Sequence, residues 1–347
     1  MLLLLRVVAA LVVVSSAAVA AAQDSNGLIF PVGASPFASS HASTIVELKD
    51  GTLESAWFGG SHEGGDDVAI WSAKKDGKGW SAPVLLAREP KVPCWNPVLF
   101  HTRDGRLWLY YKFGPSPDTW AAARKYSVDE GLTWSAAEHL PAGILGPIRA
   151  KPLVLDDGTI VAGTSFEAYN AWAIWIERTT YEGKSWTKIG PILPVAGIGS
   201  ASDNGKIRGL IQPSVINLGK GHLRLYARST QDIARICAAD SFDNGLTWTG
   251  AHALDVPNPN SGIDAVALRD GREVLIYNNS TSDRTPLDLA VSHDGEHFQN
   301  FKVLEDAPGE YSYPAIIQDA KGDLEITYTW NRKSIKYVHI LLDDIPR

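Results

Sequence analysis

The 347-residue sequence contains little cysteine, and this scarcity excludes a fold held together by disulfides. Cys94 and Cys237 are the only two cysteines, and they lie far apart in the chain, whereas disulfide-dense scaffolds need several closely spaced pairs. No basic run occurs and the net charge is −7, so the positive surface that nucleic-acid binding requires is not predicted. The sequence has no H-E-x-x-H, C-x-x-C or glycine-rich phosphate loop, so we expect no metal and no cofactor.

Long apolar runs are also absent, except at the N-terminus. Residues 1–22 combine Arg6 with an apolar stretch and end in small residues up to Ala22, the pattern of a cleavable secretory signal. We therefore expect residues 23–347 to be one secreted domain, extracellular or periplasmic, with no membrane segment once the signal is removed. An uncleaved membrane anchor is the alternative, disfavoured because the apolar stretch is short and an alanine run follows it.

What the sequence does contain is a repeat. Six copies of a strand, a glycine turn and a second strand follow one another, with turn glycines at Gly51, Gly105, Gly158, Gly221, Gly271 and Gly322. This period is that of one small antiparallel sheet per repeat. The repeat predicts an all-β fold, a six-bladed β-propeller with four-stranded antiparallel blades in a single domain.

A second motif accompanies the hairpins. Residues 127–134 and 241–248 both read S-x-D-x-G-x-T-W, and weaker copies end at Trp80, Trp186 and Phe298. The motif resembles the Asp-box of sialidases, a tight turn in which Ser and Asp side chains bind backbone amides and the Trp packs below. We interpret these boxes as structural turns on the rim.

Candidate site residues come from the strand ends that a propeller brings together around its axis. The segments just ahead of the turn glycines are polar or aromatic, and so are several ends of the strands that follow. They supply these candidates: His41, Asn96, Lys151, Gln212, Asp264 and Tyr311 from the first set, and His62, Glu63 and Arg228 from the second.

The resemblance to the sialidase superfamily extends blade by blade through residues 23–347. Residues 223–228, ending in Arg228, and 279–284, ending in Arg284, are similar to two of the three arginine segments that hold the sugar carboxylate in sialidases. Residues 310–312 are similar to the Tyr-Ser motif that supplies a nucleophilic tyrosine, which here would be Tyr311. The resemblance implies a pocket for a carboxylate-bearing sugar, because a guanidinium meets a carboxylate with two parallel hydrogen bonds.

The sequence departs from that family at three points. Residues 40–43 stand where the first arginine is expected, and Gln212 stands where a glutamate should activate the tyrosine. The acid/base aspartate has His62 and Glu63 as its nearest substitutes. A tyrosine with a pKa near ~10 is a poor nucleophile without a carboxylate beside it, so sialidase chemistry is not the preferred reading.

We prefer β-elimination at a 4-linked uronate, the reaction of propeller-type polysaccharide lyases, including those that act on rhamnose-glucuronate ends of plant glycans. Arg228 and Arg284 would neutralise the carboxylate, His41 or Tyr311 would be the base, and His62 or Tyr311 the acid. Glu63 competes with His62 as the acid. The other candidates are expected to bind substrate or line the wall: Asn96, Lys151, Gln212 and Asp264.

The expected partner is therefore an acidic oligosaccharide or polysaccharide, bound by a monomer. A sialidase-like exo-glycoside hydrolase is the first alternative. A glycan-binding propeller without catalysis is the second, since it would keep the two arginines but would not need paired proton-transfer groups.

Overall fold

The computed structural model describes residues 26–168, 171–198 and 209–347. The predicted signal at residues 1–22 lies outside the described residues, so the secretory segment and the secreted location stay predictions. Within the described part of the chain, no helix is long and apolar enough to cross a membrane.

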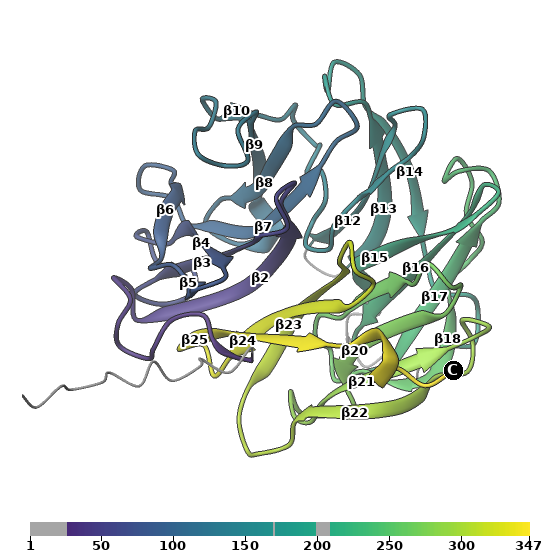
Figure 1. The fold of residues 1–347 in the computed structure, drawn as a ribbon. Helices are drawn as coiled ribbons and strands as arrows, with labels where there is room; N and C mark the ends of the chain where they lie inside the picture. Colours follow the sequence, from purple (N-terminus) through teal and green to yellow (C-terminus); the bar gives the residue numbers. More distant parts are fainter. Residues whose placement is uncertain (1–25, 169–170, 199–208) are drawn as a thin grey trace, which may run out of the picture.

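Six antiparallel sheets surround a central axis (Figure 1), as the repeat predicts. The first three blades consist of these strands: β2 (Ser39–Glu47), β3 (Leu53–Gly60), β4 (Ala69–Asp76), β5 (Gly79–Trp80) and β6 (Val84–Ala87); β7 (Cys94–His101), β8 (Leu107–Phe113), β9 (Ala121–Ser127) and β10 (Glu138–His139); β11 (Leu153–Val154), β12 (Ile160–Ala168), β13 (Ala171–Thr179) and β14 (Thr187–Ile192). A short 3-10 helix, η1 (Pro117–Thr119), joins β8 to β9.

The remaining three blades follow in order: β15 (Leu210–Gly219), β16 (His222–Ser229), β17 (Arg235–Ser241) and β18 (His252–Pro257); β19 (Asp264–Ala267), β20 (Glu273–Asn278), β21 (Leu287–Ser292) and β22 (Gln299–Glu305); β23 (Tyr311–Gln318), β24 (Leu324–Trp330), β25 (Ser334–Ile340) and β1 (Gly27–Leu28). A second 3-10 helix, η2 (Leu342–Asp344), follows β25. Five blades have the four strands expected, and the first has a fifth, because β6 also pairs with β4.

The turn glycines fulfil the role that the repeat assigns to them. All six have positive φ, between 82° and 104°, a region that glycine enters without the steric cost paid by other residues. Each hairpin therefore reverses at the same point of its blade, and the inner strands all begin at the same end of the propeller.

The Asp-boxes are rim turns, as predicted. The Ser127 hydroxyl donates to Asp129 at 2.7 Å and accepts from the Gly131 amide at 2.7 Å, while Asp129 accepts from the Thr133 amide at 2.8 Å. The Thr133 hydroxyl also donates to Asp129, and together with the Thr133 amide and the Ser127 hydroxyl it lowers the pKa of Asp129 to about 2. Residues 241–247 repeat the same bonds.

The N-terminal strand closes the ring. β1 pairs with β25 as the outer strand of the sixth blade, and the Ile29 amide donates to the Ile335 carbonyl at 2.8 Å. Phe30 is buried and its ring stacks on Trp57 of the first blade at a centroid distance of 5.1 Å. The last and first blades are thus joined both by a strand pair and by a shared core.

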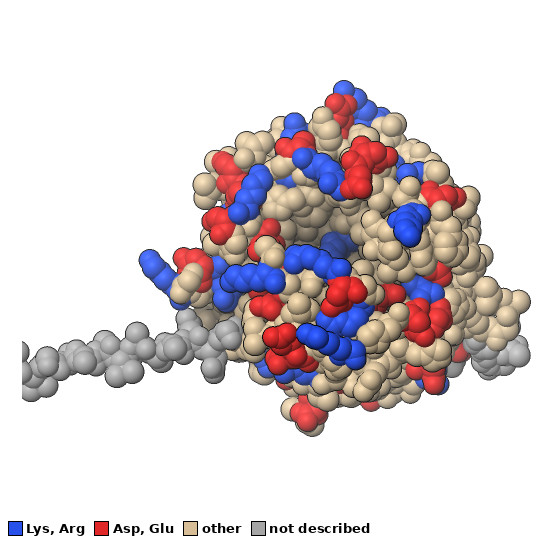
Figure 2. Space-filling view, turned by 45° about the vertical axis from the view of Figure 1, so that its right-hand side comes forward, with Lys and Arg blue, Asp and Glu red and all other residues tan. Residues whose placement is uncertain are grey.

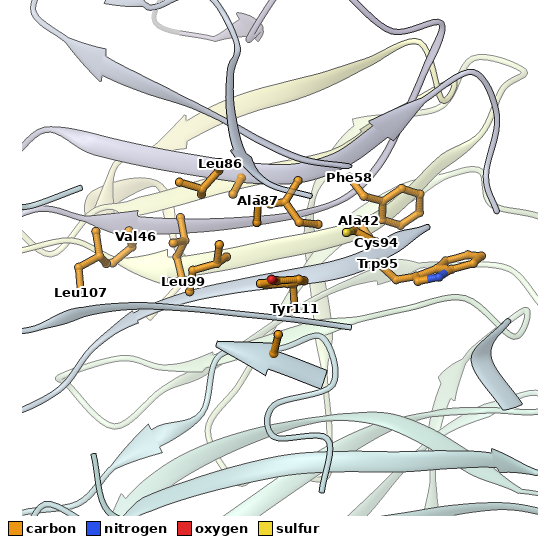
Figure 3. Close-up of a cluster of buried hydrophobic side chains, with 14 of the residues drawn as sticks. Ala42, Val46, Phe58, Leu86, Ala87, Cys94, Trp95, Leu99, Leu107 and Tyr111 are labelled. Carbon is orange, nitrogen blue, oxygen red and sulfur yellow. The ribbon is translucent and has the colours of Figure 1, made fainter. Parts of the chain in front are cut away.

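The core lies between neighbouring blades. Figure 3 shows the cluster between the first two, with Phe58, Trp95, Leu99 and Tyr111 among its members. Fully burying one such side chain contributes roughly 1.5–3 kcal/mol. This packing fixes the inner strands, and through them the side chains at their starts.

Candidate active site at the mouth of the propeller

The inner strand of each blade begins at the same end of the propeller. Four of these strands are irregular there, namely β2, β7, β15 and β23. Ala42, Asn96, Gln212 and Tyr313 have φ between 36° and 57°, and in each strand the pairing register shifts at this point. Left-handed backbone at a non-glycine residue costs on the order of 1–3 kcal/mol and is concentrated at functional sites. Because a bulge adds one residue to the strand, it changes which side chain faces the axis at the start of each of these strands.

These four positions share one spacing. Each lies nine residues before the turn glycine of its blade, as from Asn96 to Gly105. The same count reaches Arg149 in the third blade and Gly262 in the fifth. The propeller therefore presents six equivalent positions, one per blade, at its mouth: Ala42, Asn96, Arg149, Gln212, Gly262 and Tyr313.

A tyrosine lies at the centre of the polar contacts among them. The Tyr313 hydroxyl accepts a hydrogen bond from Arg228 Nη1 at 2.8 Å and another from Gln212 Nε2 at 3.2 Å. Arg228 Nη1 also donates to Gln212 Oε1 at 3.1 Å. Because arginine only donates, the amide oxygen of Gln212 must face Arg228, so its NH₂ group faces Tyr313.

Arg228 and Arg149, which both lie close to Tyr313, form no ion pair with a carboxylate of the described residues. Arg228 binds neutral acceptors, including Asn260 Oδ1 at 2.7 Å from Nε. Arg149 is 3% exposed and donates to the carbonyls of Ile263, at 3.1 Å, and Pro314. Two guanidinium groups with no direct ion pair among the described residues favour binding of an anion.

Two further arginines belong to a chain of ion pairs. Arg284 Nη1 donates to Glu310 at 2.7 Å, Arg332 Nε donates to the same carboxylate at 2.8 Å, and Arg332 also pairs with Glu63. Burial would raise the pKa of Glu310, but Arg332 and Arg284 hold it below its ordinary value. The chain joins the fifth, sixth and first blades.

His41 lies behind the tyrosine. The residue is 1% exposed, its ring centroid lies 4.2 Å from that of Tyr313, and neither ring nitrogen has a hydrogen-bond partner among the described residues. Burial, with Arg332 the next cause, lowers the pKa of His41 well below its ordinary value. His41 is therefore neutral, and it packs against the Tyr313 ring.

The structure gives Tyr311 a different place from the one expected. Its side chain is 3% exposed within the hydrophobic cluster of the last two blades, beside Tyr328. Tyr313, two residues later, takes the position beside Arg228. The bulge at Tyr313 explains the difference, because an extra residue in a strand changes which side chain faces the axis.

Lys151 and Asp264 bind each other. Lys151 Nζ lies 3.0 Å from Asp264 Oδ2, and that carboxylate also accepts from the Ser214 hydroxyl and the Ile316 amide. Asp264 is 1% exposed. These bonds join the third, fourth, fifth and sixth blades around the axis, so both residues hold the ring together.

The remaining candidates differ in their exposure and in their hydrogen bonds. His62 is exposed and its Nδ1 lies 3.0 Å from the Ser61 hydroxyl, while Glu63 is held by Arg332. Asn96 is buried, and among the described residues its side chain makes no hydrogen bond. Sequence reasoning gave Tyr313 only as a residue that stacks on a sugar face or packs, and it missed Asn260. The spacing to the turn glycine would have placed Tyr313 at the mouth, and no sequence signal identifies Asn260.

The surface view agrees with this arrangement. Figure 2 shows a hollow in the middle of one face of the molecule, with Lys or Arg atoms deep inside it and charges of both signs around its edge. An anion that enters such a hollow leaves bulk water, and its interaction with a guanidinium is strengthened there.

Comparisons with known proteins agree with the fold. Residues 51–326 match the model of the BNR repeat-like domain. A sialidase of Bacteroides fragilis is 23% identical over 252 residues, covering 66% of this chain and 43% of that protein. The chain thus spans less than half the length of this curated relative.

Solved structures of low identity share the propeller. The NanB sialidase of Streptococcus pneumoniae superposes with a TM-score of 0.73 at 14% identity, over 92% of this chain and 71% of that one. A protein of unknown function from Dyadobacter fermentans has a TM-score of 0.75 at 17% identity, over 91% and 98%. The intramolecular trans-sialidase of Ruminococcus gnavus has a TM-score of 0.70 at 13% identity, over 92% and 98%. By its matched residues and its architecture, this chain belongs to the family of BNR repeat-like domains and has the sialidase-like six-bladed propeller.

Proposed function

We propose that this protein is an exo-acting glycoside hydrolase that removes a terminal carboxylate-bearing sugar, as sialidases do. One observation carries the proposal: Arg228 and Arg149, neither paired with a carboxylate among the described residues, lie against Tyr313 at the mouth of the inner strands. The relatedness to a sialidase supports the same reaction class and favours hydrolysis over the elimination preferred from sequence.

The arginines have hydrogen-bonding capacity left for a ligand. Arg228 uses Nε and Nη1, and its Nη2 has no partner among the described residues. Arg284 uses only Nη1, on Glu310. The free N–H groups would bind the carboxylate of the sugar, at roughly 1.5–3 kcal/mol for a hydrogen bond to a charged group.

Tyr313 would then lie beside the reacting carbon. Hydrolysis of a glycoside passes through a transition state in which positive charge develops on the sugar ring. An oxygen supported by two N–H donors is suited to carry the opposing negative charge. The donors from Arg228 and Gln212 provide that support.

Gln212 favours a second candidate, β-elimination from a 4-linked uronate. The amide of Gln212 donates to Tyr313 and cannot take its proton, so the glutamate that activates the tyrosine in sialidases has no equivalent here. A tyrosine that exchanges its proton with the substrate, as elimination requires, does not need that carboxylate.

The products distinguish the two reactions. The protein is incubated with α-sialosides and with glucuronate-ended glycans, and the products are separated by mass and by ultraviolet absorbance. Hydrolysis adds water and leaves a saturated sugar, whereas elimination leaves a conjugated double bond. Release of a saturated acidic sugar is the expected result, and an unsaturated product would show the second candidate to be right.

A matched pair of variants tests the carboxylate contact. Arg228→Gln should weaken turnover of an acidic glycoside, while Arg235→Gln on the neighbouring strand β17, where the side chain is 42% exposed, should leave it unchanged. Equal effects of the two substitutions, or none from Arg228→Gln, would contradict the assignment.

A further inference from the structure

The residues bonded to Tyr313 include no proton donor for the leaving group, and His62, the exposed acid predicted from the sequence, bonds Ser61 instead. His41 is buried behind Tyr313, Glu63 is paired with Arg332, and the Asp264 carboxylate is fully bonded inside the ring. Cleavage of an unactivated glycoside requires a carboxylic acid or an equivalent group to protonate the departing oxygen. A further acid is therefore to be sought at the mouth.

The end of β12 in the third blade provides one. Strand pairing places Glu167 opposite Trp172, and directly opposed residues of antiparallel strands project from the same face. The guanidinium of Arg228 lies over the Trp172 ring, 5.9 Å from its centroid. Glu167 therefore projects from the face of the third blade that Arg228 approaches.

A second contact fixes this orientation. The Ser165 hydroxyl accepts a hydrogen bond from the backbone N–H of Gln212 at 3.2 Å, so Ser165 faces the fourth blade. The pairing of β12 with β13 runs without a register shift, and residues two apart in a strand share a face. Glu167 consequently faces the same side as Ser165, toward Gln212 and Arg228.

We propose that Glu167 is the proton donor of this site, acting on the oxygen that leaves the sugar. The inference rests on the proposed hydrolysis. The bond between the anomeric carbon and the leaving oxygen breaks, and the oxygen keeps the electron pair and takes the proton of Glu167. Water adds to the carbon, and the proton it loses returns to the Glu167 carboxylate.

The environment of Glu167 suits a proton donor. Its carboxyl makes no hydrogen bond or ion pair with any described residue, and its exposure is intermediate. Burial raises the pKa of Glu167 above its ordinary value; Arg228 opposes this effect, and Asp118 of η1, which lies against β12, adds to it. A carboxyl kept protonated nearer to neutral pH is the form that general acid catalysis uses.

The test compares leaving groups. Wild type, Glu167→Gln and Asp118→Asn are assayed on an acidic sugar linked to another sugar, and on the same acidic sugar linked to a nitrophenyl group, which departs without protonation. We expect Glu167→Gln to lower turnover of the first substrate by about a hundredfold or more and to spare the second. Asp118→Asn removes the carboxylate that adds to the raised pKa of Glu167, so it should lower turnover of the first substrate by much less than Glu167→Gln does and should also spare the second.

Binding of the free acidic monosaccharide, measured by calorimetry, separates the possible failures. Glu167→Gln should still bind it. Equal losses on both substrates, or turnover of both at the wild-type rate, would overturn the role of Glu167 alone. A wild-type protein that binds the monosaccharide but cleaves neither glycoside would overturn the proposed hydrolysis, and the role of Glu167 with it.

Discussion

A single residue separates the two tyrosines of the last inner strand, yet their surroundings differ in kind. Tyr313 is held by Arg228 and Gln212 through its hydroxyl, whereas Tyr311 packs among apolar side chains. The two therefore form a natural pair for separating chemistry from packing.

Replacing each tyrosine by phenylalanine should give opposite results. Tyr313→Phe removes the oxygen that two donors support, and we expect turnover of an acidic glycoside to fall by about a hundredfold or more, as for other lost proton-transfer or charge-bearing groups. Tyr311→Phe removes a hydroxyl that makes no hydrogen bond to a described residue, so turnover should persist. Steady-state kinetics measures both, and the reverse order of effects would restore Tyr311 as the reacting residue.

Gly262 is the smallest of the six equivalent residues at the mouth, and a larger side chain there would crowd its neighbours. A Cβ at this position would lie 3.0 Å from Arg149 Nε and 3.4 Å from Gln212 Oε1. Overpacking displaces neighbouring side chains, so alanine here would move Arg149 and Gln212 from their present positions, and a displacement that removes about 1.4 kcal/mol of binding is tenfold in affinity. We expect Gly262→Ala to weaken binding of an acidic monosaccharide roughly tenfold by calorimetry.

The control for this substitution is Gly77→Ala, since a Cβ there meets nothing within 4 Å. It should bind as the wild type does. Unchanged binding in Gly262→Ala would mean that Arg149 does not contribute to the anion site.

The site could be predicted from the sequence only in part, because a local irregularity of the backbone decides which side chains enter it. Arg228 and Gln212 lie together at strand ends, as the hairpin register predicts, whereas Arg284 was identified only by its resemblance to a sialidase segment. Tyr311 was predicted because residues 310–312 resemble the Tyr-Ser motif, and a two-residue period gives Tyr311 and Tyr313 the same face. The bulge that separates them is not visible in the sequence. Glu167 has no motif, and its role emerges only when the third and fourth blades are packed together.

Among the elements, the Asp-box turns are stabilised by their own side chains more than by packing. In the box at residues 241–248, the Ser241 hydroxyl donates to Asp243 at 2.8 Å and accepts from the Gly245 amide at 2.8 Å. The sequence predicted this element completely, because every one of these contacts spans four residues or fewer.

Ser241→Ala should destabilise the protein without affecting the site. Three hydrogen bonds are lost, one of them long at 3.5 Å, at ~1 kcal/mol or less each. The melting temperature should fall by a few degrees, on the order of 2–4 °C per kcal/mol. Ser185→Ala, at an exposed serine whose hydroxyl has no partner among the described residues, should melt as the wild type does. Thermal unfolding monitored by circular dichroism makes the comparison, and equal melting temperatures would show that the box is dispensable.

For the whole molecule, buried carboxyls make stability depend on pH. Glu54 on β3 is 1% exposed, and burial raises its pKa to about 7 although Lys74 lies 3.8 Å away. In the unfolded chain the pKa returns to about 4.3, so between these values the folded state binds a proton that the unfolded state does not. Stability from this group therefore falls as pH rises from about 4.3 through 7.

Glu54→Gln should remove that part of the pH dependence. We expect its melting temperature, relative to wild type, to be higher at pH values above about 7 than near the unfolded-state pKa of about 4.3, because the amide has no charge to bury. Glu182→Gln, which changes a side chain 45% exposed, should follow the wild-type curve. Parallel curves for Glu54→Gln and wild type would contradict the pKa shift.

The overall architecture was the most predictable level, because six turn glycines and an apolar N-terminal strand determine a closed ring. The sequence did not reveal the fifth strand of the first blade, since β6 pairs with β4 beside β5 and the repeat contains no second outer strand. Nor did it show that Lys151 and Asp264 bind each other across the axis, because alternation assigns a face to a residue but not a partner.

Closure of the ring by β1 has a consequence for synthesis of the protein. Gly27 pairs with Tyr337, so the first strand to leave the ribosome must wait for the last one to be made. Until then β1 has no partner strand, and unpaired strand edges pair with other chains. Chains released before residue 334 lack the partner of their own first strand, and these incomplete chains are the form of the protein most prone to aggregate.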